Sequence, residues 1–502
     1  MKKICILFTR VPYSGKTKTR LFDFVTRKQA AEIQIKLLQN IYKNLLSLNI
    51  DIKIFHNGEK KDDKFMSEIL KTNTFYYQKG NNLGEKMYNA FLDVYQTNKP
   101  CKIILIGSDI AENINNKIKE AFEKLDKNDI VINPTFDGGY YLVGMKKPIK
   151  EIFELEKYGK ENVFEKTIEK IKKIGLTYSI GEKALDIDTK EDILAYETGY
   201  NKIKLLGKGE YNINFLYEDE KKEKRVLRVN IKSQMNLKNQ IQYEYEALKI
   251  LEKSTVTPKV YEFSQKNKIL PYGYLTMQYL EGRVLDYNKD MEAAAYLLGK
   301  IHTTKIPDKN NLIIAENPFL MMYEECLNMA NIYLNWEKRD LKVSEYIKFF
   351  LEKCKKQLNK KEKIEKVCLI NTELNNTNFI IGESKEKSYI IDWEKPILGE
   401  CEQDLAHFLV PTTTFFRTEK ILTKKEILDF LKEYEKYNNY NYQKFLKYFT
   451  FNCLRGISWS GMAYKEYQEK EKILVDNFIF NKIKSYLDIE FLKNIQKYFK
   501  EE

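Results

Sequence analysis

The chain has 502 residues, which is too long for one hydrophobic core and long enough for two domains. With 43% hydrophobic and 31% charged residues, the composition is typical of globular rather than disordered proteins. The net charge of +13 comes from 85 basic and 72 acidic residues that interleave closely along the chain. This pattern favours a solvated surface that attracts phosphate-bearing ligands, and it argues against a nucleic-acid-binding platform.

The sequence also argues against membrane insertion and against zinc. It contains no run of eighteen apolar residues, so we expect no transmembrane helix. The apolar run at the N-terminus is short and ends at Arg10, which indicates a first strand rather than a signal peptide. The seven cysteines are scattered without a Cys-x-x-Cys pair, and the three histidines are dispersed. We therefore expect reduced thiols in a cytoplasmic protein and no zinc or histidine metal cluster.

The first two hundred residues alternate between strand and helix patterns. Apolar runs at 3–8, 52–55, 102–106 and 129–132 predict strands, and the spacing of apolar residues over 30–45 predicts a helix between them. This alternation predicts an α/β Rossmann-like domain, a mainly parallel sheet with helices on both faces, over residues 1–198. Ligands of such sheets gather at the carboxyl ends of the strands.

The pattern changes near residue 200. A glycine-bearing turn leads into an apparent strand at 225–229, a helix is expected around 240–251, and further strand follows. From about residue 285 the chain is predicted to be largely helical, apart from short apolar runs at 368–370, 379–381 and 389–391. Antiparallel strands followed by helices predict an α+β domain over residues 199–502.

A cationic, glycine-bearing loop at 9–21 directly follows the first predicted strand. Backbone N–H groups and cationic side chains of such a loop suit a di- or triphosphate, although a solvated basic loop is the bland alternative. The spacing is not that of a Walker A loop. The candidate phosphate-binding residues of this loop are Arg10, Gly15, Lys16, Lys18 and Arg20.

Two acidic motifs follow later strands. Asp109 ends the apolar strand at 103–106, a common position for a carboxylate that holds Mg²⁺ or Mn²⁺ against phosphate, although a helix N-cap is the alternative. Asp137 precedes Gly138 and Gly139, whose lack of a side chain lets backbone approach a ligand. Asp137 is then a candidate for binding a substrate hydroxyl or a metal, and a plain turn is the alternative.

Together these motifs resemble a bacterial family of GT-A-type transferases related to molybdenum-cofactor and 2-phospholactate guanylyltransferases. The resemblance rests on 12–21, 107–109, 137–144, 82–87 and 185–189, and covers roughly residues 1–198. It implies that Lys18 and Arg20 act on the nucleotide phosphates beside Arg10, Gly15 and Lys16, and that Asp109 and Asp188 bind the metal. Lys86 departs from the family's usual arginine, and Asp109 is followed by Ile-Ala-Glu rather than Pro-Gly. Nucleotidyl and glycosyl transfer both remain open, because both use this apparatus.

The second half carries kinase-like parts in chain order. Gly207, Gly209 and Asn212 belong to a turn whose backbone N–H groups suit nucleotide phosphates. Arg228 on a following strand is a candidate cation for the same phosphates, and Glu244 on the next helix is placed to orient it. The segment 278–282 is expected to form a hinge strand beside an adenine.

Residues 369–381 and 389–394 resemble the catalytic loop and metal-binding segment of the aminoglycoside phosphotransferase/choline kinase family. The resemblance covers roughly 203–410 and implies that Asn378 and Asp392 bind Mg²⁺, with Glu394 behind them. It also implies that Asp404 braces the catalytic loop, and we expect His302 and His407 to be packing residues. The residue expected to accept the acceptor's hydroxyl proton is Glu373, where the family has Asp; its extra methylene moves the carboxylate by about 1 Å, which can cost roughly a hundredfold in rate.

These patterns predict a bifunctional transferase that uses Mg²⁺ or Mn²⁺. The C-terminal domain would use ATP to phosphorylate a hydroxyl of a small polar acceptor, such as a sugar, an amino alcohol or a choline-like compound. The N-terminal domain would then join a phosphorylated small molecule to a nucleotide with release of pyrophosphate, or use a nucleotide sugar as donor. The alternative is a nucleotide-sugar-dependent glycosyltransferase fused to a non-catalytic kinase-fold module. We expect residues 411–417, Trp459 and nearby tyrosines to shape the acceptor pocket, with core packing as the more ordinary use of such aromatic residues.

Overall fold

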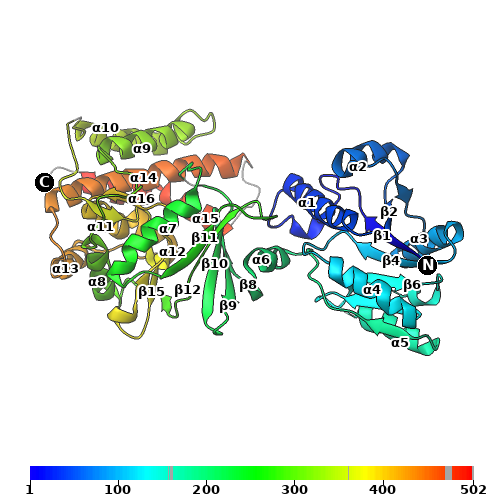
Figure 1. Ribbon diagram of the computed structural model, residues 1–502. Helices are drawn as coiled ribbons and strands as arrows, with labels where there is room; N and C mark the ends of the chain where they lie inside the picture. Colours follow the sequence, from blue (N-terminus) through cyan, green and yellow to red (C-terminus); the bar gives the residue numbers. More distant parts are fainter. Residues whose placement is uncertain (157, 159–161, 234, 360, 470–476, 500–502) are drawn as a thin grey trace. The chain divides into compact units, whose positions relative to one another are not determined.

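The computed structural model describes residues 1–156, 158, 162–233, 235–359, 361–469 and 477–499. The chain divides into two compact units, one of residues 1–204 with 266–272 and the other of 205–265 with 273–502 (Figure 1). The sequence predicts the division at 198/199, and the structure adds the short segment 266–272 to the first unit. Among the described residues, no helix combines the length and apolar character that crossing a membrane requires.

The first unit is built on a seven-stranded sheet of order β3-β2-β1-β4-β6-β5-β7. β1 pairs in parallel with β2 and β4, whereas β6 runs antiparallel to β4 and β5. The predicted α/β fold with a mainly parallel sheet is confirmed. The strands are β1 Lys2–Thr9, β2 Asp51–His56, β3 Tyr76–Tyr77, β4 Cys101–Gly107, β5 Ile130–Pro134, β6 Tyr140–Met145 and β7 Tyr178–Ile180.

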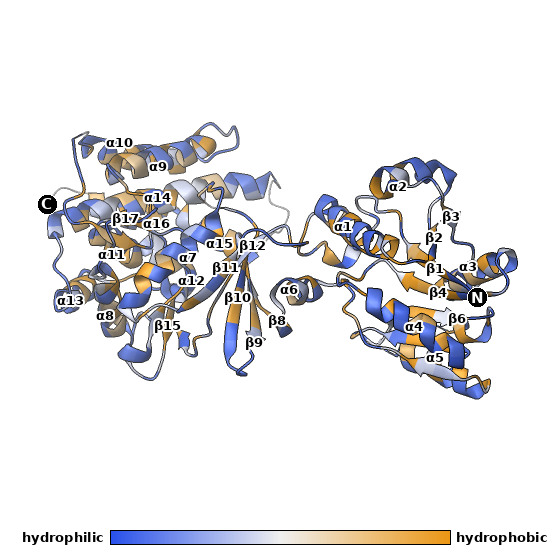
Figure 2. Ribbon diagram, in the orientation of Figure 1, coloured by the Kyte–Doolittle hydropathy of each residue, from blue (hydrophilic) through white to orange (hydrophobic). Residues whose placement is uncertain are grey.

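Helices cover both faces of this sheet because its strands are apolar on both sides. On β1, Cys5 and Leu7 join one core with α1, α2 and α4, whereas Ile4 and Ile6 join a second core with α3 and α5. Figure 2 shows the strands as a hydrophobic layer between helices of mixed polarity. The helices are α1 Arg27–Leu46, α2 Asp63–Leu70, α3 Leu83–Thr97, α4 Asn115–Lys127, α5 Val163–Lys173 and α6 Lys190–Thr198.

The second unit begins with a five-stranded sheet of order β11-β12-β10-β9-β8, in which β9, β10, β11 and β12 pair antiparallel. Helix α7 (Gln240–Leu251) packs on β11 and β12 and coincides with the predicted helix. The expected hinge strand is only partly correct, because β12 ends at Gln278. The strands are β8 Asn201–Lys208, β9 Asn212–Glu218, β10 Lys224–Asn230, β11 Val260–Ser264 and β12 Gly273–Gln278.

The rest of this unit is helical, with short strand pairs that carry the catalytic-loop motifs. β13 (Arg283–Val284), β15 (Phe379–Ile381) and β16 (Tyr389–Ile390) form one small sheet, and β14 (Cys368–Ile370) pairs with β17 (Ile397–Gly399). One large core unites these strands with the helices, as expected for the predicted α+β, kinase-like fold. The helices are α8 Met291–His302, α9 Pro318–Leu334, α10 Leu341–Lys356, α11 Cys401–Leu409, α12 Pro411–Thr418, α13 Lys424–Tyr434, α14 Tyr442–Gln468, α15 Asn477–Tyr486 and α16 Ile489–Gln496.

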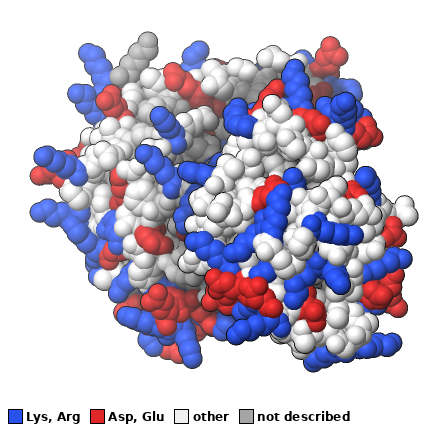
Figure 3. All heavy atoms as spheres, turned by 45° about the vertical axis from the view of Figure 1, so that its right-hand side comes forward, with Lys and Arg blue, Asp and Glu red and all other residues white. Residues whose placement is uncertain are grey.

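The surface carries charges of both signs. Figure 3 shows basic and acidic side chains interspersed over much of the face that it presents. The net charge of +13 is therefore spread among opposite charges there, and does not gather in one field.

Candidate active sites

The topology of the N-terminal sheet brings the predicted motifs to one edge. β1, β4 and β5 run in the same direction, because β6 is antiparallel to both β4 and β5. The cationic loop follows β1, Asp109 follows β4, and the turn of Asp137 follows β5. The carboxyl ends of parallel strands are where ligands of such sheets bind, so the sequence motifs lie where a site is expected.

Lys18 is the centre of this arrangement. Its side chain is only 4% exposed, and its Nζ lies 2.9 Å from Oδ1 of Asp109 and 3.1 Å from Oδ1 of Asp188. Nζ also donates to the carbonyl of Ile187. Lys18 adopts a left-handed backbone conformation, φ 49°, which costs energy outside glycine and is often retained at functional sites. The loop therefore places an ammonium group between two carboxylates that the sequence assigns to a metal.

The charges of Lys18 and Asp109 shift each other's pKa values. Burial by itself lowers the pKa of Lys18, but Asp109 and Asp188 outweigh it and the net pKa is raised. Burial would raise the pKa of Asp109, and the Lys18 ammonium reverses this to a net decrease. Arg20 is exposed and its Nη1 lies 3.1 Å from Oδ2 of Asp188. Lys18 and Asp109 thus stabilise each other's charged forms, and Arg20 adds a second cation beside Asp188.

The other residues of the loop are more exposed. Arg10 is exposed and adds to the field that lowers the pKa of Asp109. Gly15 has φ +80°, a left-handed value that glycine adopts without strain, and the Nζ of exposed Lys16 lies 5.8 Å from the centre of the Tyr13 ring. These residues remain predicted phosphate ligands around the Lys18 centre.

The sequence interpretation missed Asp186, although it lies in the same motif as Asp188. Burial raises the pKa of Asp186 to about 7, with further contributions from Asp137 and Asp188. Ile187 donates its N–H to the carbonyl of Asp109 at 2.9 Å, which aligns the two acidic segments. The alternation Asp-x-Asp was the available signal, since residues two apart on an extended segment share a face.

The turn of Asp137 is organised by its own side chain. Oδ1 of Asp137 accepts from Thr135 and, at 3.0 Å, from the N–H of Gly139. Gly138 has φ +89° and its carbonyl accepts from Phe164 at 2.9 Å. The charge of Asp137 contributes to the raised pKa of Asp186, after burial, so this turn belongs to the same acidic edge as the predicted metal ligands.

In the C-terminal domain the central cation is Arg228 on β10. Its guanidinium is buried and lies 2.9 Å from Glu244 of α7, 2.7 Å from Asp392 and 3.1 Å from Glu394. Burial lowers the pKa of Arg228, and these three carboxylates reverse the effect. The structure therefore joins the predicted phosphate cation, its orienting glutamate and the metal-binding segment, and brings Glu394 closer than expected.

The glycine turn contacts the carboxylates around Arg228 through the side chain of Asn212. Gly209 donates its N–H to the carbonyl of Asn212 at 2.8 Å and closes the turn, while Gly207 is the penultimate residue of β8. The amide of buried Asn212 donates to the Glu394 carboxylate. Burial, followed by the charge of Asp392, raises the pKa of Glu394 to about 8. Negative charge at this site is therefore only partly balanced.

The catalytic loop is held by its backbone. Asp404 of α11 accepts from the N–H groups of Asn371 and Thr372 at 2.8 Å each, and Nε2 of buried His302 lies 3.3 Å from its carboxylate. Thr372 and Asp392 have left-handed φ values of 72° and 68°. Strained residues of this kind persist where the surrounding structure holds them, so Asp404 has the bracing geometry that the sequence predicts.

Asn378 and Asp392 provide the predicted metal ligands. The amide oxygen of Asn378 accepts from the N–H of Asn375 at 2.8 Å, which leaves the second lone pair of that oxygen for a ligand. The Asp392 side chain is 42% exposed and its Oδ1 faces Arg228. Among the described residues, no three or more histidine, cysteine or acidic side chains are grouped to hold a metal ion by themselves. Nucleotide phosphates and water would have to complete the coordination shell, as is usual for Mg²⁺.

Glu373 borders a cavity of about 480 Å³. Its carboxylate lies 3.1 Å from Arg455 of α14 and 3.4 Å from Lys395, two cations that the sequence interpretation did not single out. His407, expected as a packing residue, also lines this cavity. Segment 411–417 and α14 contribute the aromatic lining that the sequence predicts, through Phe416 and Trp459.

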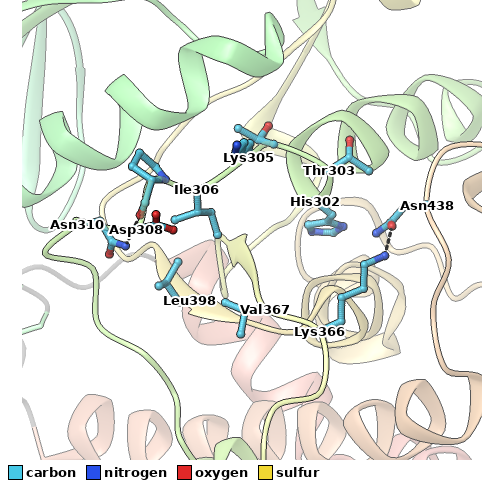
Figure 4. Close-up of a pocket in the computed structure, with 12 residues that line it drawn as sticks. His302, Thr303, Lys305, Ile306, Asp308, Asn310, Lys366, Val367, Leu398 and Asn438 are labelled. Carbon is cyan, nitrogen blue, oxygen red and sulfur yellow. Dashed lines mark hydrogen bonds between the residues drawn. The ribbon is translucent and has the colours of Figure 1, made fainter.

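A second cavity, of about 550 Å³, lies away from these motifs. Figure 4 shows His302, Lys366 and Asn438 at its side, with Lys366 Nζ donating to Asn438 at 2.6 Å. None of the predicted catalytic, nucleotide-binding or metal-binding residues lines it. The catalytic-loop residue Glu373 therefore lines the cavity of about 480 Å³ and not this one.

Comparisons with known proteins agree with the division of the chain into two domains. Residues 42–160 match the family described as "Uncharacterized protein conserved in bacteria (DUF2064)", and residues 202–441 match the "Phosphotransferase enzyme family". A 2-phospho-L-lactate guanylyltransferase from Methanocaldococcus jannaschii is 33% identical over 181 residues, which are 35% of this chain and 75% of that protein.

Solved structures resemble each part of the chain. A putative nucleotide-diphospho-sugar transferase from Desulfovibrio desulfuricans is 29% identical, with 40% of this chain and 89% of that chain covered and a TM-score of 0.38. A spectinomycin phosphotransferase in complex with ADP and spectinomycin is 16% identical, with 62% and 97% covered and a TM-score of 0.45.

Proposed function

This chain belongs to the 2-phospho-L-lactate guanylyltransferase family in its N-terminal domain and to the phosphotransferase enzyme family in its C-terminal domain, and we propose on that premise that it catalyses two consecutive transfers. The C-terminal domain phosphorylates a hydroxyl of a small molecule with ATP. The N-terminal domain then transfers a guanylyl group from GTP to that phosphate.

In the first step the acceptor hydroxyl oxygen attacks the γ-phosphorus of ATP. The bond from that phosphorus to the bridging oxygen breaks, ADP leaves, and Glu373 takes the hydroxyl proton. Arg228, oriented by Glu244, would pair with the phosphates, and the turn of Gly207, Gly209 and Asn212, which the Gly209 N–H closes, would cover them. Positioning and charge matter more than base strength in this reaction, so a glutamate at 373 is compatible with turnover.

Mg²⁺ fits the residues of this domain. Asp392 and Glu394 share one guanidinium with Glu244, so three carboxylates face a single cation that a divalent ion would supplement. Asn378 and Asp392 would hold the ion. When bound, it would neutralise negative charge on the ATP phosphates.

In the second step a phosphate oxygen of the product attacks the α-phosphorus of GTP, and pyrophosphate leaves. Lys18 and Arg20 are the cations for the triphosphate, with Arg10, Gly15 and Lys16 around them, and Asp109 and Asp188 are the metal ligands. Asp137, Gly138 and Gly139 would contact the phosphorylated acceptor. Burial, followed by the charges of Asp137 and Asp188, raises the pKa of Asp186, and a divalent cation at this edge would offset the charges of these neighbouring carboxylates.

The observation that carries this proposal is the convergence of Lys18, Asp109 and Asp188 at the strand ends of a domain 33% identical to a guanylyltransferase. A guanylyl transferase needs a cationic triphosphate site and a metal site at one place, and this edge supplies residues for both.

The test supplies purified full-length protein with ATP, GTP, Mg²⁺ and a panel of hydroxy compounds, and follows ADP, pyrophosphate and products by mass spectrometry. We expect a product containing both the acceptor phosphate and a guanylyl group. The proposal fails if neither ADP nor pyrophosphate forms with any acceptor.

Variants of Glu373 separate a kinase from a non-catalytic kinase-fold module. We expect Glu373→Gln to lower ADP formation by about a hundredfold, and Glu373→Asp to stay within about tenfold of the unmodified protein. Glu383→Gln, at an exposed residue paired with Lys387, is the matched control. ATP binding without turnover in every form would identify the domain as a binding module.

A further inference from the structure

The cavity beside Glu373 contains cations as well as aromatic side chains. Its wall includes Phe416, Trp459 and Tyr486, which suit an apolar or flat portion of a ligand. Arg455 and Lys395 also line the cavity, and both lie against the Glu373 carboxylate. An acceptor that enters this cavity therefore meets positive charge directly beside the reacting position.

Arg455 is fixed in place by several contacts. Its guanidinium is largely buried and donates to the carbonyl of Thr372 at 3.2 Å, and it lies 3.1 Å from Glu373 and 3.2 Å from Glu325. Glu325 is on α9 and its side chain is 42% exposed. A planar guanidinium that is already oriented toward carboxylates is suited to bind a further carboxylate from a ligand.

Lys395 strengthens the positive charge at the same point. Its Nζ lies 3.4 Å from Glu373 and 3.9 Å from Glu325, so its ion pair with Glu325 is at the limit of contact. Among the described residues, both cations lie against Glu373 and Glu325. When Glu373 takes the acceptor's proton during phosphoryl transfer, one of these negative charges is lost.

We propose that the acceptor of the kinase domain is a hydroxy carboxylic acid, whose carboxylate binds Arg455 and Lys395 while its hydroxyl faces Glu373. This inference rests on the proposed kinase activity and names its substrate class. The acceptor carboxylate restores the negative charge that Glu373 gives up. The hydroxyl oxygen forms its bond to the γ-phosphorus, ADP leaves, and the proton stays on Glu373 until it passes to water.

The same proposal disfavours amino alcohols and quaternary ammonium compounds as acceptors. Once Glu373 has taken the hydroxyl proton, their positive charge would lie near Arg455 and Lys395 with one carboxylate fewer to offset the repulsion. The product of a hydroxy acid is a phosphorylated hydroxy acid. That is also the chemical class of 2-phospho-L-lactate, which the name of the N-terminal domain's relative specifies.

The test uses matched acceptors that differ in one group. Full-length protein is incubated with ATP, Mg²⁺ and lactate, 1,2-propanediol or 1-amino-2-propanol. A larger series repeats the same acid, alcohol and amine groups on the carbon skeleton of 3-phenyllactate. The phosphorylated product is measured by ³¹P NMR and mass spectrometry. We expect the hydroxy acids to be phosphorylated with a kcat/KM at least about tenfold above that of the neutral and cationic members. Preferred phosphorylation of a diol or amino alcohol overturns this inference and leaves the kinase activity standing. No phosphorylation of any member overturns both.

Variants show whether the cations select the acceptor. We expect Lys395→Gln to lower the ratio of kcat/KM for hydroxy acid over diol by roughly tenfold, and Arg455→Lys by roughly a hundredfold. Both measurements use a ratio because a merely structural defect would lower activity toward both acceptors equally. Lys387→Gln, which removes an exposed lysine paired with Glu383, is the control and leaves the ratio unchanged. An unchanged ratio in both Lys395→Gln and Arg455→Lys contradicts the proposal.

Discussion

Both domains organise their acidic residues around one buried cation, but the cations differ in kind. In the N-terminal domain the single Nζ of Lys18 contacts Asp109 and Asp188. In the C-terminal domain Arg228 divides its contacts, with Nε toward Glu244 and Nη2 toward Asp392 and Glu394. Lysine acts as a point charge on a flexible stem, whereas arginine is a rigid fork.

This difference relates to where each cation is attached. Lys18 belongs to a loop, so its ammonium group can exchange carboxylates for phosphates when a nucleotide arrives. Arg228 belongs to the middle of a sheet and is held by α7, so it is a fixed part of the site. From this comparison we expect the N-terminal site to reorganise when a nucleotide binds and the C-terminal site to change little.

The largest expected effects come from removing one metal ligand in each domain. We expect Asp392→Asn to lower ADP formation by about 10³-fold and to leave pyrophosphate release from a supplied phosphorylated acceptor unchanged, because charge that stabilises a transferring phosphoryl group is lost only there. Asp188→Asn should produce the reverse pattern. Coupled loss of both activities in either variant would contradict two separate sites.

Exchanging the two cations sharpens the comparison. Arg228→Lys should lower kinase activity by about a hundredfold, because one ammonium group does not reproduce contacts to Glu244 and Asp392 made by separate nitrogen atoms. Lys18→Arg keeps the charge and should lower guanylyl transfer by about tenfold, since the larger group is crowded in a buried position. Lys150→Arg, at an exposed lysine paired with Glu154, is the control. Equal losses of activity in Arg228→Lys and Lys18→Arg would contradict the proposal that the two sites need different cations.

A pH effect is expected in the C-terminal domain through His407. Burial, together with the charge of Arg455, lowers the pKa of His407 to about 4. The unfolded chain therefore binds more protons than the folded one between pH 4 and about 6.5, and stability falls as the pH decreases through this range. We expect a loss of about 2 kcal/mol between pH 7 and pH 4 from this residue, reduced by its partial exposure.

Chemical denaturation at several pH values measures this dependence. His407→Gln should flatten it for the C-terminal transition and leave the N-terminal transition unchanged. An identical pH dependence in the variant would show that His407 is not its source.

Helix caps provide the smallest effects and test whether the domains unfold separately. Thr26 accepts from the N–H of Gln29 at 3.2 Å at the start of α1, and Thr423 accepts from Glu426 at 3.2 Å at the start of α13. Each threonine-to-alanine change should cost about 1 kcal/mol. Thr26→Ala should shift only the N-terminal unfolding transition and Thr423→Ala only the C-terminal one, as followed by calorimetry.

The sequence by itself determined the two fold classes and the positions of the main motifs. The strand β1 and the helix α7 were predicted within about one residue, because residue spacing of two or 3.6 directly reflects which faces are buried. Local sequence also placed the cationic loop and Asp109 after strands, which is enough to put both at one edge of a parallel sheet. The strand β6 was not predicted from the sequence, and its antiparallel direction follows from the short turn between Pro134 and Tyr140, because a parallel pair needs a long crossover connection.

Only the tertiary structure decided which charges meet. Lys18 and Asp188 are 170 residues apart in the sequence, and Arg455 on helix α14 is 82 residues from Glu373 in the catalytic loop. Residue spacing does not reveal such pairs, because in the sequence each of these residues resembles the many charged residues that stay in water. Folding buries them together, since a charge removed from water is stable only beside a partner.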